Sequence, residues 1–512
     1  MRAQDCPFHR RRNGGSGMSG TLARTQFGLV EGLREGDVCV WRGIPYAAPP
    51  INSRRFHPPQ NPESWTGVRE TKEFGPASLQ SKSPSMEFLL DSPVSQAEDC
   101  LYLNVWSPCA DSHRRPVMVW IHGGSFNYGS GSSCMYDGRF FAEQGVVVVT
   151  INYRVGVFGF LYLGEVGDED YRDSVNCGLL DQVAALKWVN GNIDAFGGDP
   201  DNVTIFGESA GAVSVGNLLS MASAKGLFHK AILQSGTARA NVTRETANEL
   251  TRKLLDELQL NTGNLSKLEH LPAETIMNAI GIFPRRVFGP VGDGVVMPER
   301  PDLVLAEGVA SNIPVIVGTN LDESRLFTNF DPVWKGQTDE QNVKKILESS
   351  FQSLWEAVYQ SVMQNGELTR KNYEDAMTHY VFTYPAIFFG ESQARNGGQV
   401  WMYRFDYEST ALDGSPRAYH ALEIPFVWNT IRNPETERMT GSDANRFIVA
   451  EHMHRRWIAF AHHGDPNVPG LPSWPQYDPQ YRSTMIFDVN SGVVMDPDCQ
   501  KRLSWEQVFR HR

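Results

Sequence analysis

Short apolar runs alternate with longer amphipathic segments through most of the chain. Two of the runs, residues 117–121 and 146–151, are almost wholly apolar, which is typical of strands buried on both faces of a parallel sheet. In residues 180–190, by contrast, apolar side chains recur every three or four positions, as on one face of a helix. Strands that alternate with helices predict an α/β fold with a large, mostly parallel sheet and helices on both faces.

The same patterns place the remaining elements. An antiparallel hairpin is expected at the start, with strands at 26–32 and 38–43. Further strands are expected at 101–106, 203–206, 230–234, 313–318, 400–405 and 483–487, and further helices at 210–222, 245–258, 339–363, 373–395 and 447–462. The chain has no internal repeat and no low-complexity linker beyond its start. We therefore expect a disordered leader, residues 1–20, and one domain with helical insertions, residues 21–512.

Composition narrows the class of protein. The 512 residues are 41% hydrophobic and 21% charged, as in soluble globular proteins. The net charge of −12 argues against binding to nucleic-acid backbones. No apolar run is long enough to span a bilayer. The seven cysteines are odd in number, scattered and without a C-x-x-C pair, which favours a reducing, cytoplasmic location over a disulfide framework or a zinc site.

One motif indicates chemistry. Gly207-Glu-Ser-Ala-Gly211 is a G-x-S-x-G sequence, the pattern of the nucleophile elbow. A strand precedes it and a helix follows it with almost no loop, so the chain must bend sharply at Ser209. Such a bend requires small residues two positions before and after, and Gly207 and Gly211 meet this requirement. The motif predicts that Ser209 is an exposed nucleophile at the carboxyl end of a strand.

A serine nucleophile needs a base, and the base needs an orienting acid. In proteins with this elbow the acid and then the histidine follow the serine along the chain. Residues 313–318 are a strand followed by Asp322 and Glu323, and both remain candidates for the acid on this argument. After the next strand, residues 400–405, the first histidine is His420, which is therefore the expected base.

The reaction also needs hydrogen-bond donors for the oxyanion that develops on the substrate. After the strand at 117–121 comes His122-Gly-Gly-Ser125, a glycine-rich turn that exposes backbone N–H groups. The amide of Ala210, which follows the nucleophile, is the expected remaining donor. No metal or cofactor is expected.

Together these segments resemble the type-B carboxylesterase family of the α/β-hydrolase fold, and most closely its bacterial para-nitrobenzyl esterases. The resemblance extends from about Gln26 to the C-terminus and includes Trp41-Arg-Gly-Ile-Pro-Tyr-Ala47, Glu98-Asp-Cys-Leu-Tyr-Leu-Asn-Val105 and Trp401-Met-Tyr-Arg-Phe-Asp406. It implies that Ser209 is the nucleophile, Glu323 the acid and His420 the base. It implies further that the amides of Gly124, Ser125 and Ala210 form the oxyanion hole, that Ser235 is a partner of the acid, and that Arg55 pairs with Glu98.

The chain departs from the family pattern at two places. Secreted members join the cysteine that matches Cys100 to an upstream cysteine, and here that upstream position is Ser78. We therefore expect all seven cysteines to be free. The family's acid loop reads Asp-Glu-Gly, but here Ser324 replaces the glycine and Arg325 follows. An arginine beside the acid could lower the pKa of that carboxyl.

The expected activity is the hydrolysis of carboxylic esters of small molecules, through an acyl-enzyme, by a monomer or homodimer. Aromatic side chains near the nucleophile, Phe327 together with Phe283 and Phe288, are expected to line the substrate pocket and to favour short acyl groups. One alternative is a lipase-like enzyme for longer esters. Another is a non-catalytic, cholinesterase-like binding protein, which the presence of all three catalytic residue types disfavours.

Overall fold

The computed structural model describes residues 20–89, 95–167, 171–284, 287–334, 340–364 and 367–509. The expected leader lies outside the described residues apart from Gly20. Within these ranges, eleven strands form one large sheet, in the spatial order β14, β13, β12, β11, β10, β9, β7, β8, β6, β4, β3. In that order the strands are Gly492–Met495, Ser483–Phe487, Val400–Phe405, Val315–Asn320, Lys230–Gln234, Gly198–Glu208, Arg115–Ile121, Val147–Ile151, Tyr102–Ser107, Val38–Pro45 and Leu33–Glu35.

The centre of this sheet is parallel and its two edges are antiparallel. All neighbours from β8 through β7, β9, β10, β11 and β12 to β13 pair in parallel, whereas β14 at one edge and β6, β4 and β3 at the other pair antiparallel. The carboxyl ends of β7, β9 and β11 therefore lie at the same side of the sheet. This is the side where ligands bind in open α/β folds.

The hairpin at the start differs in one detail from the expectation. β3 and β4 form an antiparallel hairpin across Gly36 and Asp37. The preceding run, β2 (Gly28–Glu31), instead joins a separate three-stranded sheet with β1 (Leu22–Thr25) and β5 (Val68–Glu70). One extended segment thus contributes short strands to two sheets, which the apolar pattern does not distinguish.

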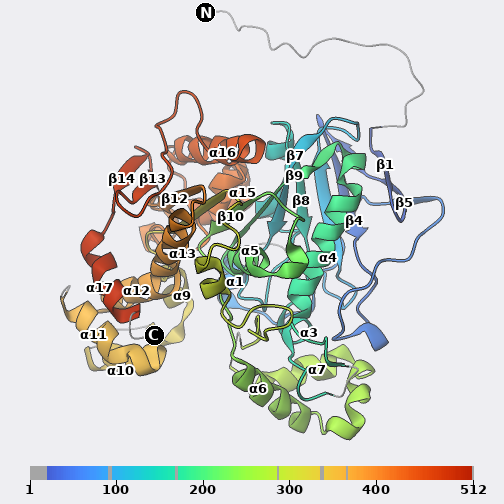
Figure 1. Ribbon diagram of the computed structural model, residues 1–512, viewed down its shortest axis with the longest axis horizontal. Coiled ribbons are helices and arrows are strands. Elements are labelled where there is room, and N and C mark those ends of the chain that lie inside the picture. Colours follow the sequence, from blue (N-terminus) through green and yellow to red (C-terminus); the bar gives the residue numbers. More distant parts are fainter. Residues whose placement is uncertain are drawn as a thin grey trace, which may run out of the picture.

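Both faces of the central strands are buried, as their apolar sequences predict. In β7, Val117, Val119 and Ile121 belong to one apolar core, whereas Met118 and Trp120 belong to a second core on the opposite face. Helices α4 (Cys177–Asn192), α5 (Ala210–Ser220) and α13 (Tyr384–Arg395) pack in the first core. Helices α14 (Ile424–Val427) and α16 (Arg446–His463) pack in the second. Figure 1 shows the sheet between these helices.

Two of the long helices expected from the sequence are interrupted. The segment at 339–363 contains α10 (Glu340–Phe351) and α11 (Trp355–Gln364), separated by a 3-10 turn. The segment at 373–395 lies in a longer helical stretch in which a π-helical turn, His379–Thr383, separates α12 (Arg370–Thr378) from α13. The remaining helices are α1 (Pro84–Leu89), α2 (Arg139–Ala142), α3 (Gly156–Phe160), α6 (Arg244–Glu257), α7 (Ala273–Ala279), α8 (Pro301–Ala306), α9 (Arg325–Phe330), α15 (Pro434–Thr440) and α17 (Cys499–Phe509).

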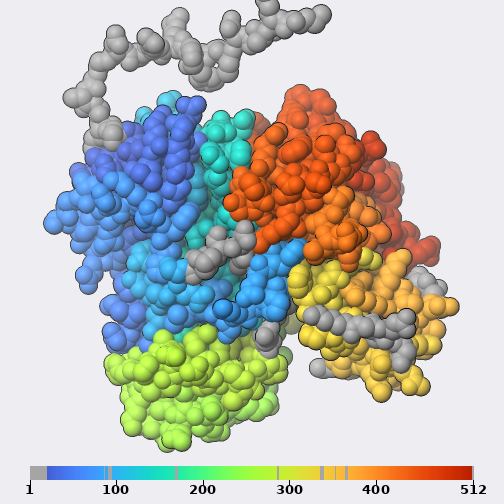
Figure 2. All heavy atoms as spheres, turned by 180° about the vertical axis from the view of Figure 1, so that it is seen from behind, coloured from blue at the N-terminus to red at the C-terminus, as the bar shows by residue number. Residues whose placement is uncertain are grey.

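Two helical projections extend from one end of the sheet. One contains α6 and α7 and the other contains α10, α11 and α12 (Figure 1). Seen from behind, the two projections, coloured green and yellow, are separate bulges with a hollow between them (Figure 2). No helix in the described ranges is both long enough and apolar enough to cross a membrane.

An expected ion pair joins the start of the chain to the body of the fold. The guanidinium of Arg55 donates two hydrogen bonds to the carboxylate of Glu98, at 2.5 and 2.7 Å, which confirms the prediction. Its remaining nitrogen donates to the carbonyl oxygens of Leu268 and Leu271 at 2.9 and 2.7 Å. Arg55 is 5% exposed, so one buried cation holds together three segments that are distant in sequence.

Candidate active site

Ser209 lies at a sharp bend between β9 and α5. Its backbone angles, φ 55° and ψ −122°, fall outside the favoured regions for a residue with a side chain. A Cβ atom on Gly207 would lie 2.6 Å from the carbonyl oxygen of Ile121, and one on Gly211 would lie 2.0 Å from the same oxygen. Only glycine fits at either position. The bend leaves Ser209 partly exposed between two buried neighbours, Glu208 and Ala210.

The structure brings Glu323 and His420 into direct contact. His420 Nδ1 lies 2.6 Å from Glu323 Oε2, and the backbone N–H of His420 donates to the carbonyl oxygen of Glu323 at 3.3 Å. The second carboxylate oxygen of Glu323 accepts the backbone N–H of Asn320 at 2.8 Å. Both side chains are almost completely buried. Because the carboxylate accepts the Nδ1 proton, the lone pair of the neutral ring lies on Nε2.

Asp322, the other candidate for the acid, is engaged elsewhere. Its carboxylate pairs with Arg417 at 3.1 Å and with Arg325 at 3.5 Å. Arg325 also lies 3.5 Å from Glu374, and no ion pair joins it to Glu323 among the described residues. The geometry places Glu323, and not Asp322, beside His420, a distinction that the order of residues along the chain leaves open. It also directs the charge of Arg325 toward Asp322 and Glu374.

Two further buried carboxylates surround the histidine. Glu208 Oε1 lies 3.1 Å from His420 Nε2, and Glu423 accepts hydrogen bonds from Asn320 and Gln234 at 2.6 and 3.1 Å. Neither acid follows from the order of the three expected residues. Two features of the sequence could identify these acids. Glu208 lies inside the elbow motif, and Glu423 lies in an apolar run, three residues after His420.

These carboxylates govern the protonation of His420. Burial lowers the pKa of His420, but the carboxylates of Glu208 and Glu323 raise it by more, to about 9. Burial also raises the pKa of Glu208 well above its usual range, although the charge of His420 opposes this. Glu208 and His420 thus compete for one proton. When Glu208 holds it, the imidazole is neutral and can act as a base.

The glycine-rich turn lies directly against the serine. A Cβ atom on Gly123 would be 3.2 Å from the Cβ of Ser209. Gly124 and Ser125 have φ of 112° and 54°, so the turn runs through the left-handed region. No described residue accepts a hydrogen bond from the backbone N–H of Gly124 or Ser125. The N–H of Ala210 begins helix α5 and has no acceptor within the helix. Three unpaired donors thus surround Ser209.

Two neighbouring spaces adjoin Ser209. A large cavity of about 630 Å³ lies between the two helical projections and is lined by Ser209, Ala210 and side chains of both, including Thr246 of α6 and Tyr373 of α12. A small cavity of about 30 Å³ lies on the side of His420, among Glu208, Leu326 and Ile424.

Aromatic rings separate these two spaces. Phe327 lines both, and its ring centroid lies 5.1 Å from that of His420. Phe382, from the π-helical turn, lies 4.8 Å from His420 and parallel to Phe327. Phe382 is an aromatic wall residue that the sequence argument does not identify, because the π-helical turn that carries it is not recognisable as such.

The remaining expected residues are Phe288, Phe283 and Ser235. Phe288 lines the large cavity, but Phe283 lines a neighbouring one with Asn127 and Tyr128 and packs edge-to-face on Phe288 at 6.0 Å. Phe283 is therefore not part of the wall beside Ser209. Ser235 is buried, but its hydroxyl forms no hydrogen bond with any described residue, so the expected bond to the acid is absent. The backbone of Asn320 holds Glu323 instead.

Comparisons with known proteins agree with this geometry. A family profile described as the Carboxylesterase family matches residues 19–503. The para-nitrobenzyl esterase of Bacillus subtilis is 39% identical over 498 residues, which cover 95% of this chain and 98% of that protein. The fumonisin B1 esterase of Sphingopyxis macrogoltabida is 36% identical over 483 residues, which cover 89% of this chain and 84% of that protein.

A solved structure is similar throughout. The carboxylesterase of Geobacillus stearothermophilus, at pH 6.2, superposes with a TM-score of 0.87 and 42% sequence identity, over 95% of this chain and all of that one. The chain therefore belongs to the carboxylesterase family, has the α/β-hydrolase fold and is a carboxylic ester hydrolase.

Proposed function

We propose that Ser209, His420 and Glu323 are the nucleophile, the general base and the orienting acid of this esterase. His420 Nε2 takes the proton of Ser209 as the hydroxyl oxygen attacks the ester carbonyl, and returns it to the departing alcohol. In the second half of the reaction His420 removes a proton from water as the water oxygen attacks the acyl carbonyl. It returns this proton to the oxygen of Ser209 as the bond between the acyl group and the serine breaks and the carboxylic acid leaves. Glu323 holds the ring in the required tautomer and stabilises its cation. The observation that supports this most is the 2.6 Å contact between Glu323 and His420.

The oxyanion of each tetrahedral intermediate binds to the amides of Gly124, Ser125 and Ala210. The support for this step is the lack of any acceptor for the first two N–H groups among the described residues, and the helix-terminal position of the third. Donors that are already aligned and dry stabilise developing charge without further reorganisation. The N-terminus of α5 adds a favourable dipole at the same point.

The two cavities beside Ser209 suggest how an ester is placed. The small space next to His420 and Phe327 suits a short acyl group, whereas the large cavity accommodates a bulkier alcohol. The enzyme therefore prefers short acyl chains, and the natural ester joins a short acid to a larger alcohol. The dependence of kcat/KM on the length of the acyl chain tests this orientation.

The decisive experiment is labelling with a fluorophosphonate, which reacts with an activated serine. Wild-type protein is expected to incorporate one label per chain, on the peptide that contains Ser209. The Ser209→Ala variant is expected to fold normally, to take up no label and to lose esterase activity by several orders of magnitude, since the three residues act as a unit. Stoichiometric labelling of the alanine variant would refute the assignment.

A further inference from the structure

The acid loop departs from the family pattern at Ser324, and both Ser324 and the following Arg325 make contacts that fix the loop. The backbone N–H of Ser324 donates to the hydroxyl of Thr378 on α12 at 3.1 Å, and that hydroxyl donates to the hydroxyl of Ser324 at 3.2 Å. The acid itself, Glu323, immediately precedes this pair. One end of α12 thus binds the chain directly after the acid.

A buried carboxylate on the same helix binds the next turn of the loop. Glu374 is 6% exposed and accepts hydrogen bonds from Thr328 at 2.5 Å and from Arg370 at 2.8 Å. Arg370 in turn donates to Asn329 at 2.6 Å. Glu374 and Arg370 therefore join α9, which follows the acid, to α12, which forms one wall of the large cavity.

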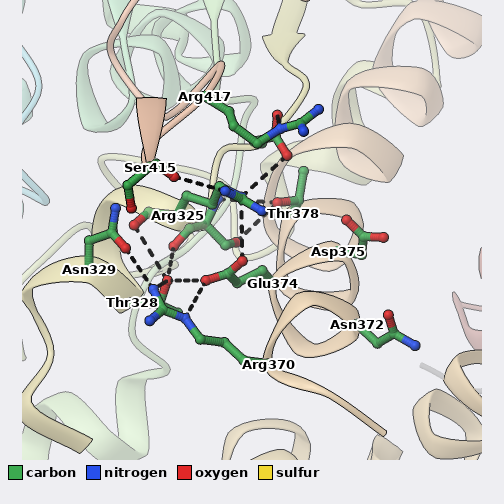
Figure 3. Close-up of polar contacts among 12 residues, drawn as sticks. Arg325, Thr328, Asn329, Arg370, Asn372, Glu374, Asp375, Thr378, Ser415 and Arg417 are labelled. Carbon is green, nitrogen blue, oxygen red and sulfur yellow. Dashed lines mark hydrogen bonds and ion pairs between the residues drawn. The ribbon is translucent and has the colours of Figure 1, made fainter. Parts of the chain in front are cut away.

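Arg325 extends this network to the loop that carries the base. Its guanidinium lies 3.5 Å from both Asp322 and Glu374 and donates to the carbonyl oxygen of Ser415 at 2.8 Å. Figure 3 shows Arg325 between Glu374 and Thr378 on one side and Ser415 on the other. Arg325 thus contacts three segments. These are the loop that carries Glu323, helix α12, which lines the large cavity, and the loop of Ser415, which leads to His420.

Near the triad the same two loops are joined by further contacts. The N–H of His420 donates to the carbonyl oxygen of Glu323 at 3.3 Å, and the side chain of Asn320 donates to the carbonyl oxygen of Tyr419 at 2.8 Å and to Glu423 at 2.6 Å. Asp322 N–H donates to the carbonyl oxygen of Ala418 at 2.9 Å, and Asp322 pairs with Arg417. Asp322 also pairs with Arg325, at 3.5 Å. A shift of the acid loop relative to the base loop would therefore change the distance between Glu323 and His420 directly.

We propose that Arg325 is a positioning residue for ester hydrolysis, which clamps the loops of Glu323 and His420 against helix α12 and so maintains the contact between acid and base. This inference rests on the proposed roles of Glu323 and His420. Arg325 does not touch the substrate. Its effect is on the alignment of the base, so its loss acts on the chemical step more than on binding.

The test compares two arginines that share a partner. Arg325→Gln removes the contacts to Asp322, Glu374 and Ser415, whereas Arg370→Gln removes contacts to the same Glu374 and the same helix α9 but does not involve the base loop. We expect Arg325→Gln to lower kcat by about 10- to 100-fold, as a small misalignment does, with little change in KM. We expect Arg370→Gln to lower kcat much less, and Arg325→Lys, which retains the charge, to keep more activity than Arg325→Gln.

A pH profile separates positioning from a general loss of stability. The charged groups that face His420 are Glu208, Glu323 and Glu423, and a looser contact with Glu323 lowers the pKa of the ring. The acid limb of kcat/KM should therefore move to lower pH in Arg325→Gln. If Arg325 acted only through its positive charge, its removal would raise the pKa of His420 and move the acid limb to higher pH. Partial unfolding would lower the plateau of kcat/KM without moving the acid limb. An unmoved limb, or a kcat equal to that of Arg370→Gln, would overturn the proposal.

Fluorophosphonate titration keeps this test distinct from that of the proposed function. If wild-type protein is labelled at Ser209 and Arg325→Gln retains full kcat, only the role of Arg325 is wrong. If the label is not on Ser209, the catalytic assignment itself fails. Arg455→Gln, which breaks an exposed ion pair with Glu451 on α16, is the control for removal of any arginine and should match wild type.

Discussion

Glu208 is adjacent to the nucleophile in sequence and in contact with the base in space, so its charge influences when the base is free. The carboxylate of Glu208 favours the protonated imidazole and contributes to the raised pKa of His420. A general base must be neutral to accept a proton, so activity rises as the pH passes upward through the pKa of His420. Replacement by Glu208→Gln removes the charge and lowers that pKa.

We therefore expect the acid limb of kcat/KM for Glu208→Gln to move toward lower pH, by about 1 to 3 pH units, as for a charge in direct contact. The measurement is kcat/KM from acid to neutral pH with a soluble nitrophenyl ester. Glu423→Gln is the matched control, because Glu423 is equally buried and makes the smallest of the contributions to the pKa of His420. A limb that stays in place in Glu208→Gln, or moves to higher pH, would show that Glu208 does not act through His420.

At the scale of single residues, the sequence identifies the side chains whose positions follow from the backbone geometry and from their order along the chain. Ser209 lies in a bend that only flanking glycines allow, and His420 is the first histidine after the strand that follows the acid, so both are recognisable from local pattern and order. The choice between Asp322 and Glu323 depends on side-chain direction, which order does not contain. Glu208 and Glu423 contact His420 through tertiary packing, and Ser235 lacks its expected bond for the same reason.

Among the elements, α9 and the π-helical turn form the aromatic partition beside the nucleophile. Phe327 of α9 and Phe382 of the turn stack in parallel and both lie against His420. Removal of the ring of Phe327 would join the small cavity to the large one and give longer acyl chains room. Phe327→Ala should therefore raise kcat/KM for octanoate relative to acetate esters by about 10-fold, since contacts of this size contribute about 1–3 kcal/mol.

The acyl series on wild type and Phe327→Ala provides the measurement. Phe330→Ala is the control, since Phe330 lies on the same helix but packs on Phe88, away from both cavities. If Phe327→Ala and Phe330→Ala have the same chain-length profile as wild type and differ from it only in stability, then Phe327 is a packing residue and acyl selection occurs elsewhere.

Elements with a strong periodic pattern are the ones that the sequence predicts well. The central strands β7, β8 and β12 are mostly apolar and occur where expected, whereas β9 begins at Gly198, ahead of the expected run at 203–206, with a polar and partly exposed first half. The break between α12 and α13 is not visible in this way, because a π-helical turn inserts residues without interrupting the apolar pattern. That turn places Phe382 beside His420, so this part of the aromatic wall could not be predicted from the sequence.

For the whole molecule, Arg55 is a buried side chain that joins three distant segments. It bonds Glu98 and the carbonyl oxygens of residues 268 and 271, more than 200 positions away. Arg55→Ala would leave Glu98 without its cation and two carbonyl groups without donors. We expect a loss of about 3–5 kcal/mol in the free energy of unfolding. Equilibrium unfolding in urea measures this, with Arg300→Ala as the control for an exposed pair, expected within about 0.5 kcal/mol of wild type. An equal midpoint for the two variants would contradict it.

The last prediction concerns the cysteines, which we expect to form no disulfide in the folded chain. None of the six cysteines in the described ranges forms a disulfide, and Cys6 lies outside those ranges. Cys100 has Ser78, not a second thiol, as its hydrogen-bond partner. Burial raises the pKa of Cys177 to about 11, and Cys39, Cys100 and Cys177 are all inaccessible to solvent. Because the thiolate is the reactive form, these three should not react with a thiol reagent in the folded protein. After unfolding in guanidinium chloride without reductant, all seven thiols of the chain should titrate. A deficit of two in the unfolded sample would reveal a disulfide, and rapid native labelling of Cys100 would show that its environment opens in solution.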